Sequence, residues 1–180
     1  TFGGINLEDI KAPEAFEIEN LGADFYNFIK TSNISELSIN SHTIKDEFQD
    51  DPTGRFLHGL KLKAYEFNFY KYKKNKNLIL IDVFTKKNNN TIKNEIRFKA
   101  LEEGTNFARD LVSEPPNVLN PKEYVKRLLK LRKLGIKVTV YNEKQLFKLG
   151  MHSLLGVGRG SINESFLVTL EWNGNKKNKK

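Results

Sequence analysis

Two adjacent prolines, Pro115 and Pro116, place a fixed break in this chain of 180 residues. Proline lacks the amide hydrogen that a helix interior needs, and its ring clashes with the preceding turn, so no helix can continue through the pair. A helical pattern precedes the break, and a new helix signal follows it at Asn120. We therefore expect a structural boundary between Glu114 and Asn120.

Helical and strand patterns alternate before this break. Residues 16–30 repeat apolar side chains with a helical period, and residues 35–39 fit a short strand. The turn at residues 50–54 begins a second helix, and the apolar run at residues 78–84 predicts a strand buried on both faces. The residues expected on the buried stripe of the second helix are Phe56, Leu57, Leu60, Ala64 and Phe67.

A long third helix is expected to begin at a capping Thr91 and to end near Ser113. The residues expected to face its core are Ile92, Ile96, Leu101, Ala108 and Leu111. Beyond the break, Asn120 can cap a helix that has Pro121 at its first position and Glu123 at its third. Residues 136–141 alternate as a strand, residues 142–149 form a capped helix that Gly150 stops, and residues 165–172 form a strand. This alternation predicts an α/β architecture.

Composition narrows the possible compartments and functions. The chain has no cysteine, which excludes disulfides and thiolate metal sites and fits a reducing cytosol. No apolar run approaches the ~20 residues that cross a bilayer, and no signal peptide is recognisable, so we expect a cytoplasmic protein without membrane contact. The net charge of +8 is uneven, because residues 1–50 carry three lysines against ten acidic residues. The basic part therefore lies beyond residue 50.

Lysine accumulates in that basic part between Lys61 and Lys76, where five aromatic residues are interleaved with it. One interpretation is a solvated surface without a partner. The alternative is a surface for nucleic acid, since cations and stacking rings together bind single strands. The absence of arginine from this segment weakens any prediction of base recognition.

The three histidines, His42, His58 and His152, have no second histidine at ligand spacing, so a zinc site is not favoured. We expect His58 to be half-buried with its polar atoms satisfied. We expect His152 to be a turn residue that packs between a short helix and the next strand.

Gly156, Gly158 and Gly160 alternate with other residues, a spacing that invites comparison with phosphate-binding loops. Dinucleotide loops require a different glycine spacing and lead into a helix, whereas a strand is expected here. A glycine-rich strand and turn is therefore the favoured interpretation, and nucleotide binding is the alternative.

Paired carboxylates are interpreted as solvated charge; the pairs are Asp46–Glu47, Asp50–Asp51 and Glu102–Glu103. Neither Ser113 nor Ser161 lies in a Gly-x-Ser-x-Gly elbow, so neither is expected to be a nucleophile.

Four segments resemble the leucyl aminopeptidases, also called cytosol aminopeptidases, of the M17 peptidase family. Phe107-Ala-Arg-Asp-Leu-Val-Ser-Glu-Pro-Pro-Asn117 resembles the end of their interdomain helix and its proline break, and Asn120-Pro-Lys-Glu123 resembles the start of their catalytic domain. Residues 149–165 resemble bacterial members, and Glu171-Trp-Asn-Gly174 is similar to the end of a family strand. The resemblance is strong over residues 104–174 and weak over residues 14–103.

The resemblance implies three parts. Residues 1–90 would form a macro-like N-terminal α/β domain that is incomplete at its start. Residues 91–119 would form the linking helix with its Pro-Pro break, and residues 120–180 would begin the aminopeptidase catalytic domain, which is truncated. In such a fragment the strand at residues 165–172 would expose an edge.

Family members are hexameric metalloenzymes of the cytoplasm that release N-terminal residues, preferably leucine, from peptides. Two divalent ions, manganese or zinc, would polarise the scissile carbonyl and supply hydroxide. The family's ligands lie in a Val-Gly-Lys-Gly segment and an Asn-Thr-Asp-Ala-Glu-Gly-Arg motif, and neither is present here. We therefore expect no catalytic, cofactor-binding or metal-binding residue in this chain, and no hydrolysis of peptides by the chain alone.

Two kinds of partner follow. A separately encoded C-terminal half could complete the enzyme. Alternatively, the chain is a non-catalytic binding module, for nucleic acid through the lysine-rich face or for a metabolite through the macro-like domain.

Overall fold

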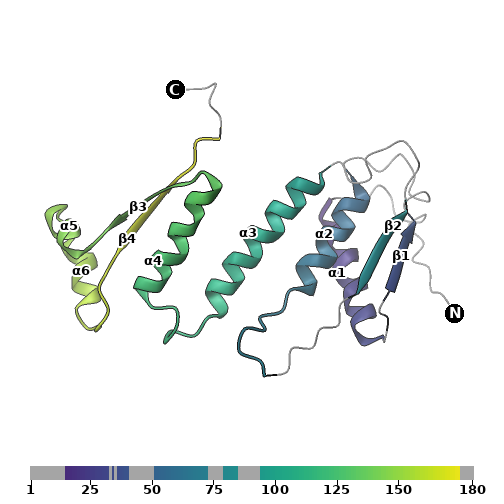
Figure 1. The fold of residues 1–180 in the computed structure, drawn as a ribbon, viewed down its shortest axis with the longest axis horizontal. Helices are drawn as coiled ribbons and strands as arrows, with labels where there is room; N and C mark the ends of the chain where they lie inside the picture. The colour runs from purple at the N-terminus through teal and green to yellow at the C-terminus, as the bar shows by residue number, and fades with distance from the viewer. Residues whose placement is uncertain are drawn as a thin grey trace. The chain divides into compact units, whose positions relative to one another are not determined.

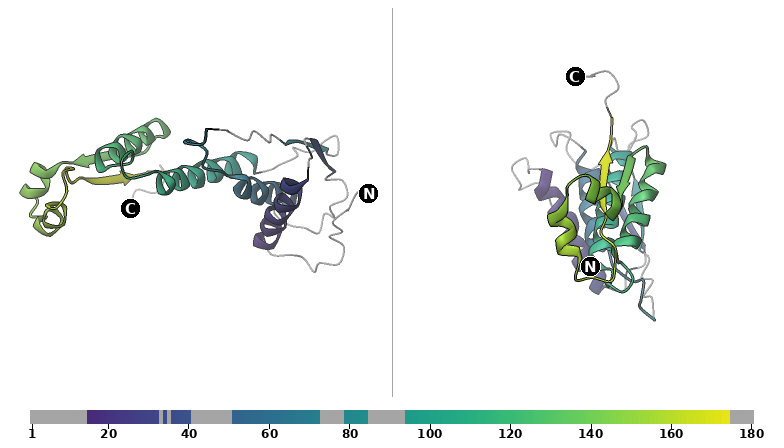
Figure 2. Two further views of the ribbon diagram at one scale, coloured as in Figure 1. Left: turned by 90° about the horizontal axis from the view of Figure 1, so that it is seen from below. Right: turned by 90° about the vertical axis from the view of Figure 1, so that its left-hand side faces the viewer.

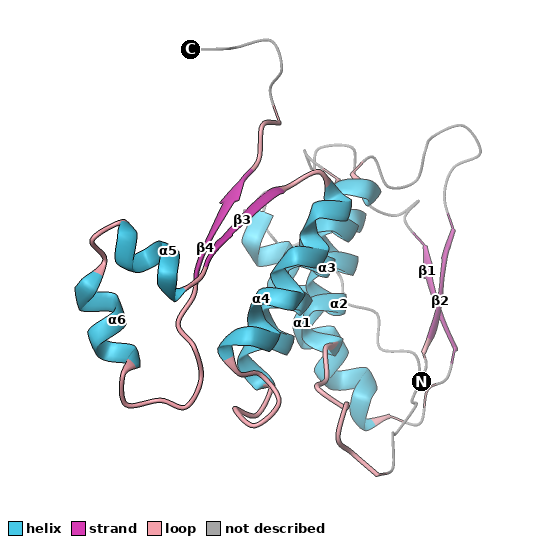
Figure 3. Ribbon diagram, turned by 60° about the vertical axis from the view of Figure 1, so that its left-hand side comes forward, coloured by secondary structure: helices cyan, strands magenta, loops and turns pink. Residues whose placement is uncertain are grey.

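The computed structural model describes residues 15–32, 34, 36–40, 51–72, 79–84 and 94–174 (Figure 1). The chain divides into two compact units, residues 1–110 and residues 111–180. Each unit combines helices with a two-stranded sheet, as the colours of Figure 3 show. The predicted α/β class is confirmed.

The first unit contains α1 (Ala15–Thr31), β1 (Glu36–Asn40), α2 (Pro52–Ala64), β2 (Leu80–Phe84) and most of α3 (Glu95–Ser113). β1 and β2 are parallel, with Leu37 opposite Ile81 and Ile39 opposite Val83. The helices and strands predicted for residues 16–39 and 50–84 are thereby confirmed, although α2 ends before Phe67.

Two glycines allow α1 and α2 to pack closely against each other. A side-chain carbon on Gly59 would collide with the backbone carbonyl of Glu19, and one on Gly22 would collide with the carbonyl of Phe56. The two backbones therefore touch where the helices cross. Around this contact lie the buried side chains Ile18, Ile29, Leu57 and Leu60. Apolar periodicity locates the two helices, but only the absence of side chains at the crossing permits this approach.

Two predictions about burial are wrong. β2 is not buried on both faces. Leu80 and Phe84 lie on one face and are 63% and 57% exposed, whereas Ile81 and Val83 on the other face are partly covered. In α3, Ile96 is 88% exposed and Leu101 is 48% exposed. The buried residue of α3 is Phe98, which stacks on His58 of α2. The helical period is correct, but the face that packs within the described chain is a different one. Thr91 and Ile92 lie outside the described residues.

An exposed ion pair joins the end of α1 to the segment after α2. Lys30 Nζ lies 2.9 Å from Glu66 Oε1, and this hydrogen bond raises the pKa of Lys30 and lowers that of Glu66 below its ordinary 4.5. The pair therefore stabilises the fold at neutral pH, and its contribution disappears as acid protonates Glu66. We expect Lys30→Gln to lower the urea midpoint slightly at pH 7 and not at pH 3. Equal losses at both pH values would contradict this assignment.

The second unit contains α4 (Pro121–Leu129), the 3₁₀ helix η2 (Lys130–Leu134), β3 (Lys137–Tyr141), α5 (Glu143–Lys148), α6 (His152–Gly158) and β4 (Leu167–Glu171). β3 and β4 are antiparallel, with Val138 opposite Leu170 and Val140 opposite Val168. The two further views in Figure 2 show α5 and α6 together at one end of this sheet.

The predicted caps of this unit are confirmed. The Asn120 side chain accepts the amide of Glu123 at the start of α4, and Asn142 forms a reciprocal capping box with Gln145 at the start of α5. Gly150 follows α5 with a φ of 73°, a conformation that favours glycine. These short helices therefore begin and end where their local sequences direct them to.

Candidate functional site

A cluster of ionisable side chains lies between α2 and α3. His58 Nδ1 is 3.1 Å from Glu102 Oε1, and Lys61 Nζ is 3.5 Å from Glu102 Oε2. Because a carboxylate only accepts hydrogen bonds, His58 donates from Nδ1. The side chains of His58 and Glu102 are only 7% and 12% exposed. His58 has a hydrogen-bond partner, as predicted, but it is buried where a half-buried position was expected. The interpretation of Glu102 as solvated charge is wrong.

Asp51 also has a structural role. Its carboxylate accepts the amides of Gly54, at 2.9 Å, and of Asn94, at 3.0 Å, so that it caps α2 and fixes the chain just before α3. The prediction of a solvated pair is therefore wrong for Asp51. Glu103 is exposed, as expected for solvated charge, whereas Asp46, Glu47 and Asp50 lie outside the described residues, as does His42.

The glycine-rich segment is not the predicted strand and turn. Gly156 and Gly158 lie in the second half of α6, and Gly160 follows it. Phosphate-binding loops present the N-terminus of a helix, whereas these glycines lead out of one. Gly158 lies against Ser165, and a side-chain carbon there would displace the Ser165 hydroxyl. The geometry favours close packing over nucleotide binding.

The remaining candidate residues, His152, Ser161 and Ser113, are exposed. His152 is the first residue of α6 and not the expected turn residue. Its ring meets that of Phe147 edge-on at 4.8 Å, so it packs on the short helix α5 as predicted. Ser161 Oγ accepts the amide of Asn163, and Ser113 ends α3 in an exposed position. The contacts of the described residues give neither hydroxyl a histidine base.

A cavity of about 670 Å³ lies between α5, α6 and the loop after α6. Its wall includes Lys144, Lys148 and Arg159 beside a single acidic residue, Glu143. Glu143 Oε1 accepts the amide of Ser165 and thereby ties the loop to α5. The cavity is electropositive, but its charged side chains are exposed and none is held in place by a buried partner.

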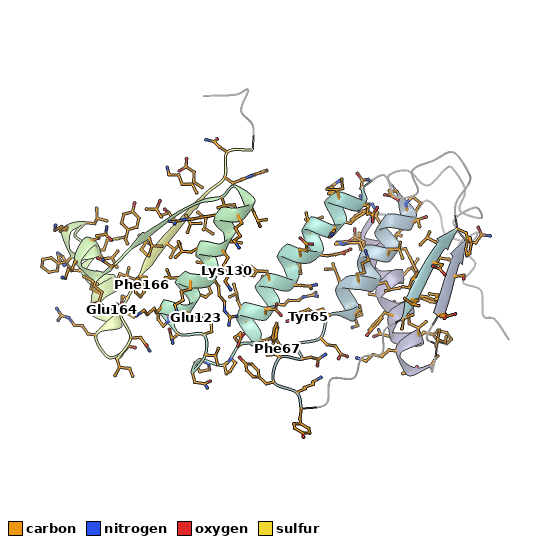
Figure 4. All side chains as sticks on the ribbon, in the orientation of Figure 1. Tyr65, Phe67, Glu123, Lys130, Glu164 and Phe166 are labelled. Carbon is orange, nitrogen blue, oxygen red and sulfur yellow. The ribbon has the colours of Figure 1, made fainter. Side chains whose placement is uncertain are left out.

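A second hollow, of about 580 Å³, lies between α4 and β4. Its lining is apolar apart from Asn120 and the hydroxyl of Tyr124. Phe166, labelled in Figure 4, comes directly before β4 and contributes one wall. The other apolar lining residues are Leu119, Pro121, Val125, Leu128, Val168 and Leu170. We call this hollow the α4–β4 groove.

Glu114, directly before the proline pair, is bound by Arg127 of α4. Arg127 Nη2 lies 2.8 Å from Glu114 Oε1, and the two side chains are 19% and 5% exposed. Sequence patterns gave no sign of this pair, because the two residues belong to different elements. It fixes the chain at the Pro-Pro break to the helix that follows.

The basic and aromatic segment follows α2. The ring of Phe67 contacts those of Phe69 and Tyr70, and Tyr72 is fully exposed. Figure 4 labels Tyr65 and Phe67, which begin this segment. Lys61 and Lys71 pair with Glu102 and Glu66, which reduces the free positive charge beside the rings. Residues 73–76 of the lysine run lie outside the described residues.

Within the described ranges, no three histidine, cysteine or acidic side chains are grouped so that they could hold a metal ion. The His58–Glu102 pair supplies two donors, but the ammonium group of Lys61 already occupies the other Glu102 oxygen. The described residues therefore do not fit a two-ion centre. In the same ranges no helix is long and apolar enough to cross a membrane.

Comparison with known proteins gives a consistent result. Residues 106–180 match the family model described as the cytosol aminopeptidase family, catalytic domain. A probable cytosol aminopeptidase of Phytoplasma mali is 38% identical over 125 residues, which cover 66% of this chain and 25% of that protein. One of Caulobacter vibrioides is 34% identical over 175 residues, covering 95% of this chain and 34% of that protein. The chain thus spans about a quarter to a third of these relatives.

Solved structures share the fold. A mutant of tomato leucine aminopeptidase superposes with a TM-score of 0.73 at 19% identity, covering 91% of this chain and 34% of that one. The bottromycin maturation enzyme BotP in complex with Mn has a TM-score of 0.70 at 23% identity, covering 88% of this chain and 33% of that one.

Proposed function

Because the chain belongs to the cytosol aminopeptidase family, we propose that it is part of a metal-dependent enzyme that releases N-terminal amino acids, preferably leucine, from peptides. The observation that carries this proposal is the match of residues 106–180 to the family's catalytic domain. The relatives in Phytoplasma mali and Caulobacter vibrioides support it, since they match this chain over 66% and 95% of its length.

In the proposed domain organisation, residues 1–90 form an N-terminal macro-like domain, residues 91–119 form the link, and residues 120–180 form the start of the catalytic domain. The capped start of α4 at Asn120 and the Glu114–Arg127 pair support a structural role for the motif around the prolines. In this proposal these residues position the catalytic domain's first helix and take no part in chemistry.

We further propose that the complete enzyme is cytosolic and hexameric and uses two divalent ions, manganese or zinc. The fold shared with a manganese-bound maturation enzyme supports a divalent ion. Bound ions would polarise the peptide carbonyl and activate water. No group of described residues fits such a centre, so its ligands would come from another part of an aminopeptidase catalytic domain.

The test is an assay of leucine p-nitroanilide hydrolysis with manganese and with zinc. The isolated chain is expected to release no product above buffer. A chimera in which residues 106–174 of this chain replace the matching segment of the Caulobacter vibrioides relative is expected to retain activity within about tenfold of that relative, because this segment supplies structure and not ligands.

The intact relative is the positive control. An inactive chimera that shows the relative's circular dichroism and oligomeric state would contradict the proposed function. Hydrolysis by the isolated chain that a chelator abolishes would contradict the assignment of the catalytic groups to another segment.

The nucleic-acid alternative stays a hypothesis. Exposed Phe69, Tyr70 and Tyr72 favour it, since rings on a basic surface can stack on bases. Pairing of Lys61 and Lys71 with carboxylates weighs against it. Retention on single-stranded DNA that falls steeply with salt would support it.

A further inference from the structure

We draw no further inference here: the strongest candidate, the electropositive cavity between α5, α6 and the loop after α6, rests on the exposed side chains of Lys144, Lys148 and Arg159, which no buried partner among the described residues holds in place, and nothing in the structure shows what fills or covers it.

Discussion

Replacing Gly59 with alanine is expected to lower the free energy of unfolding of the first unit by roughly 1–3 kcal/mol, the usual cost of overpacking. The added methyl group would overlap the carbonyl of Glu19, a backbone atom that can move only if α1 moves as a whole. Gly22→Ala is expected to have the same effect, because its methyl group would overlap the carbonyl of Phe56.

The matched control for this prediction is Gly104→Ala. Gly104 lies within α3, and a side-chain carbon there would meet no atom within 4 Å. In a helix, alanine is favoured over glycine by about 0.5–1 kcal/mol, so this variant should be more stable than the native chain. Urea denaturation monitored by circular dichroism measures all three variants. Stabilisation by Gly59→Ala would show that α1 and α2 do not touch at this point.

The second large effect is expected for Glu114→Ala. Its carboxylate is 5% exposed and bound to Arg127, so removal would leave a guanidinium that is 19% exposed without this partner. Breaking a fully buried pair costs about 3–5 kcal/mol, and the partial exposure of Arg127 reduces our expectation to roughly 2–3 kcal/mol. The urea midpoint of the second unit, followed by fluorescence of Trp172, measures the loss.

Glu123→Ala is the control on the same arginine. Glu123 Oε1 is 3.8 Å from Arg127 Nε, and its side chain is 31% exposed. Exposed pairs contribute about 0–1 kcal/mol, so this variant should differ little from the native chain. If Glu114→Ala and Glu123→Ala lowered the free energy of unfolding equally, burial of the Glu114 carboxylate would not make its pair with Arg127 the stronger one.

Signals between neighbouring residues in the sequence predicted where several helices begin and end. Asn120, Pro121 and Glu123 predict the start of α4 because capping uses residues three positions apart, and the box at Asn142 works in the same way. Gly150 likewise marks the end of α5 through its left-handed backbone. Such devices depend on neighbours in sequence, so they can be recognised without knowledge of the tertiary structure.

Burial was harder to predict, because it depends on residues distant in sequence. Helical period groups Ile96 with Leu101, but it cannot tell that Phe98 faces α2 while these two stay exposed. Similarly, Glu102 looked like one of two solvated carboxylates until the fold placed it against His58. The partner that decides the environment lies 44 residues away.

The candidate functional site could be predicted from the sequence only in part. The motif around the prolines was recognisable from its residues, and so was its relation to the aminopeptidases. The structural role of Glu114 was not, since Arg127 stands 13 residues further along the chain. Residues 165–172 were expected to form a strand, but only the position of α4 shows that Phe166, Val168 and Leu170 line a groove.

The parallel pairing of β1 with β2 has a consequence for the order of folding. Parallel strands cannot be joined by a tight turn, and here the chain between them contains α2. All contacts between the two strands join residues distant in sequence. Forming the pair therefore closes a long loop, and the lost chain entropy opposes pairing until other contacts have formed. We therefore expect α1 and α2 to associate before the sheet forms. The glycines at their crossing would then influence the rate of folding as well as the final stability.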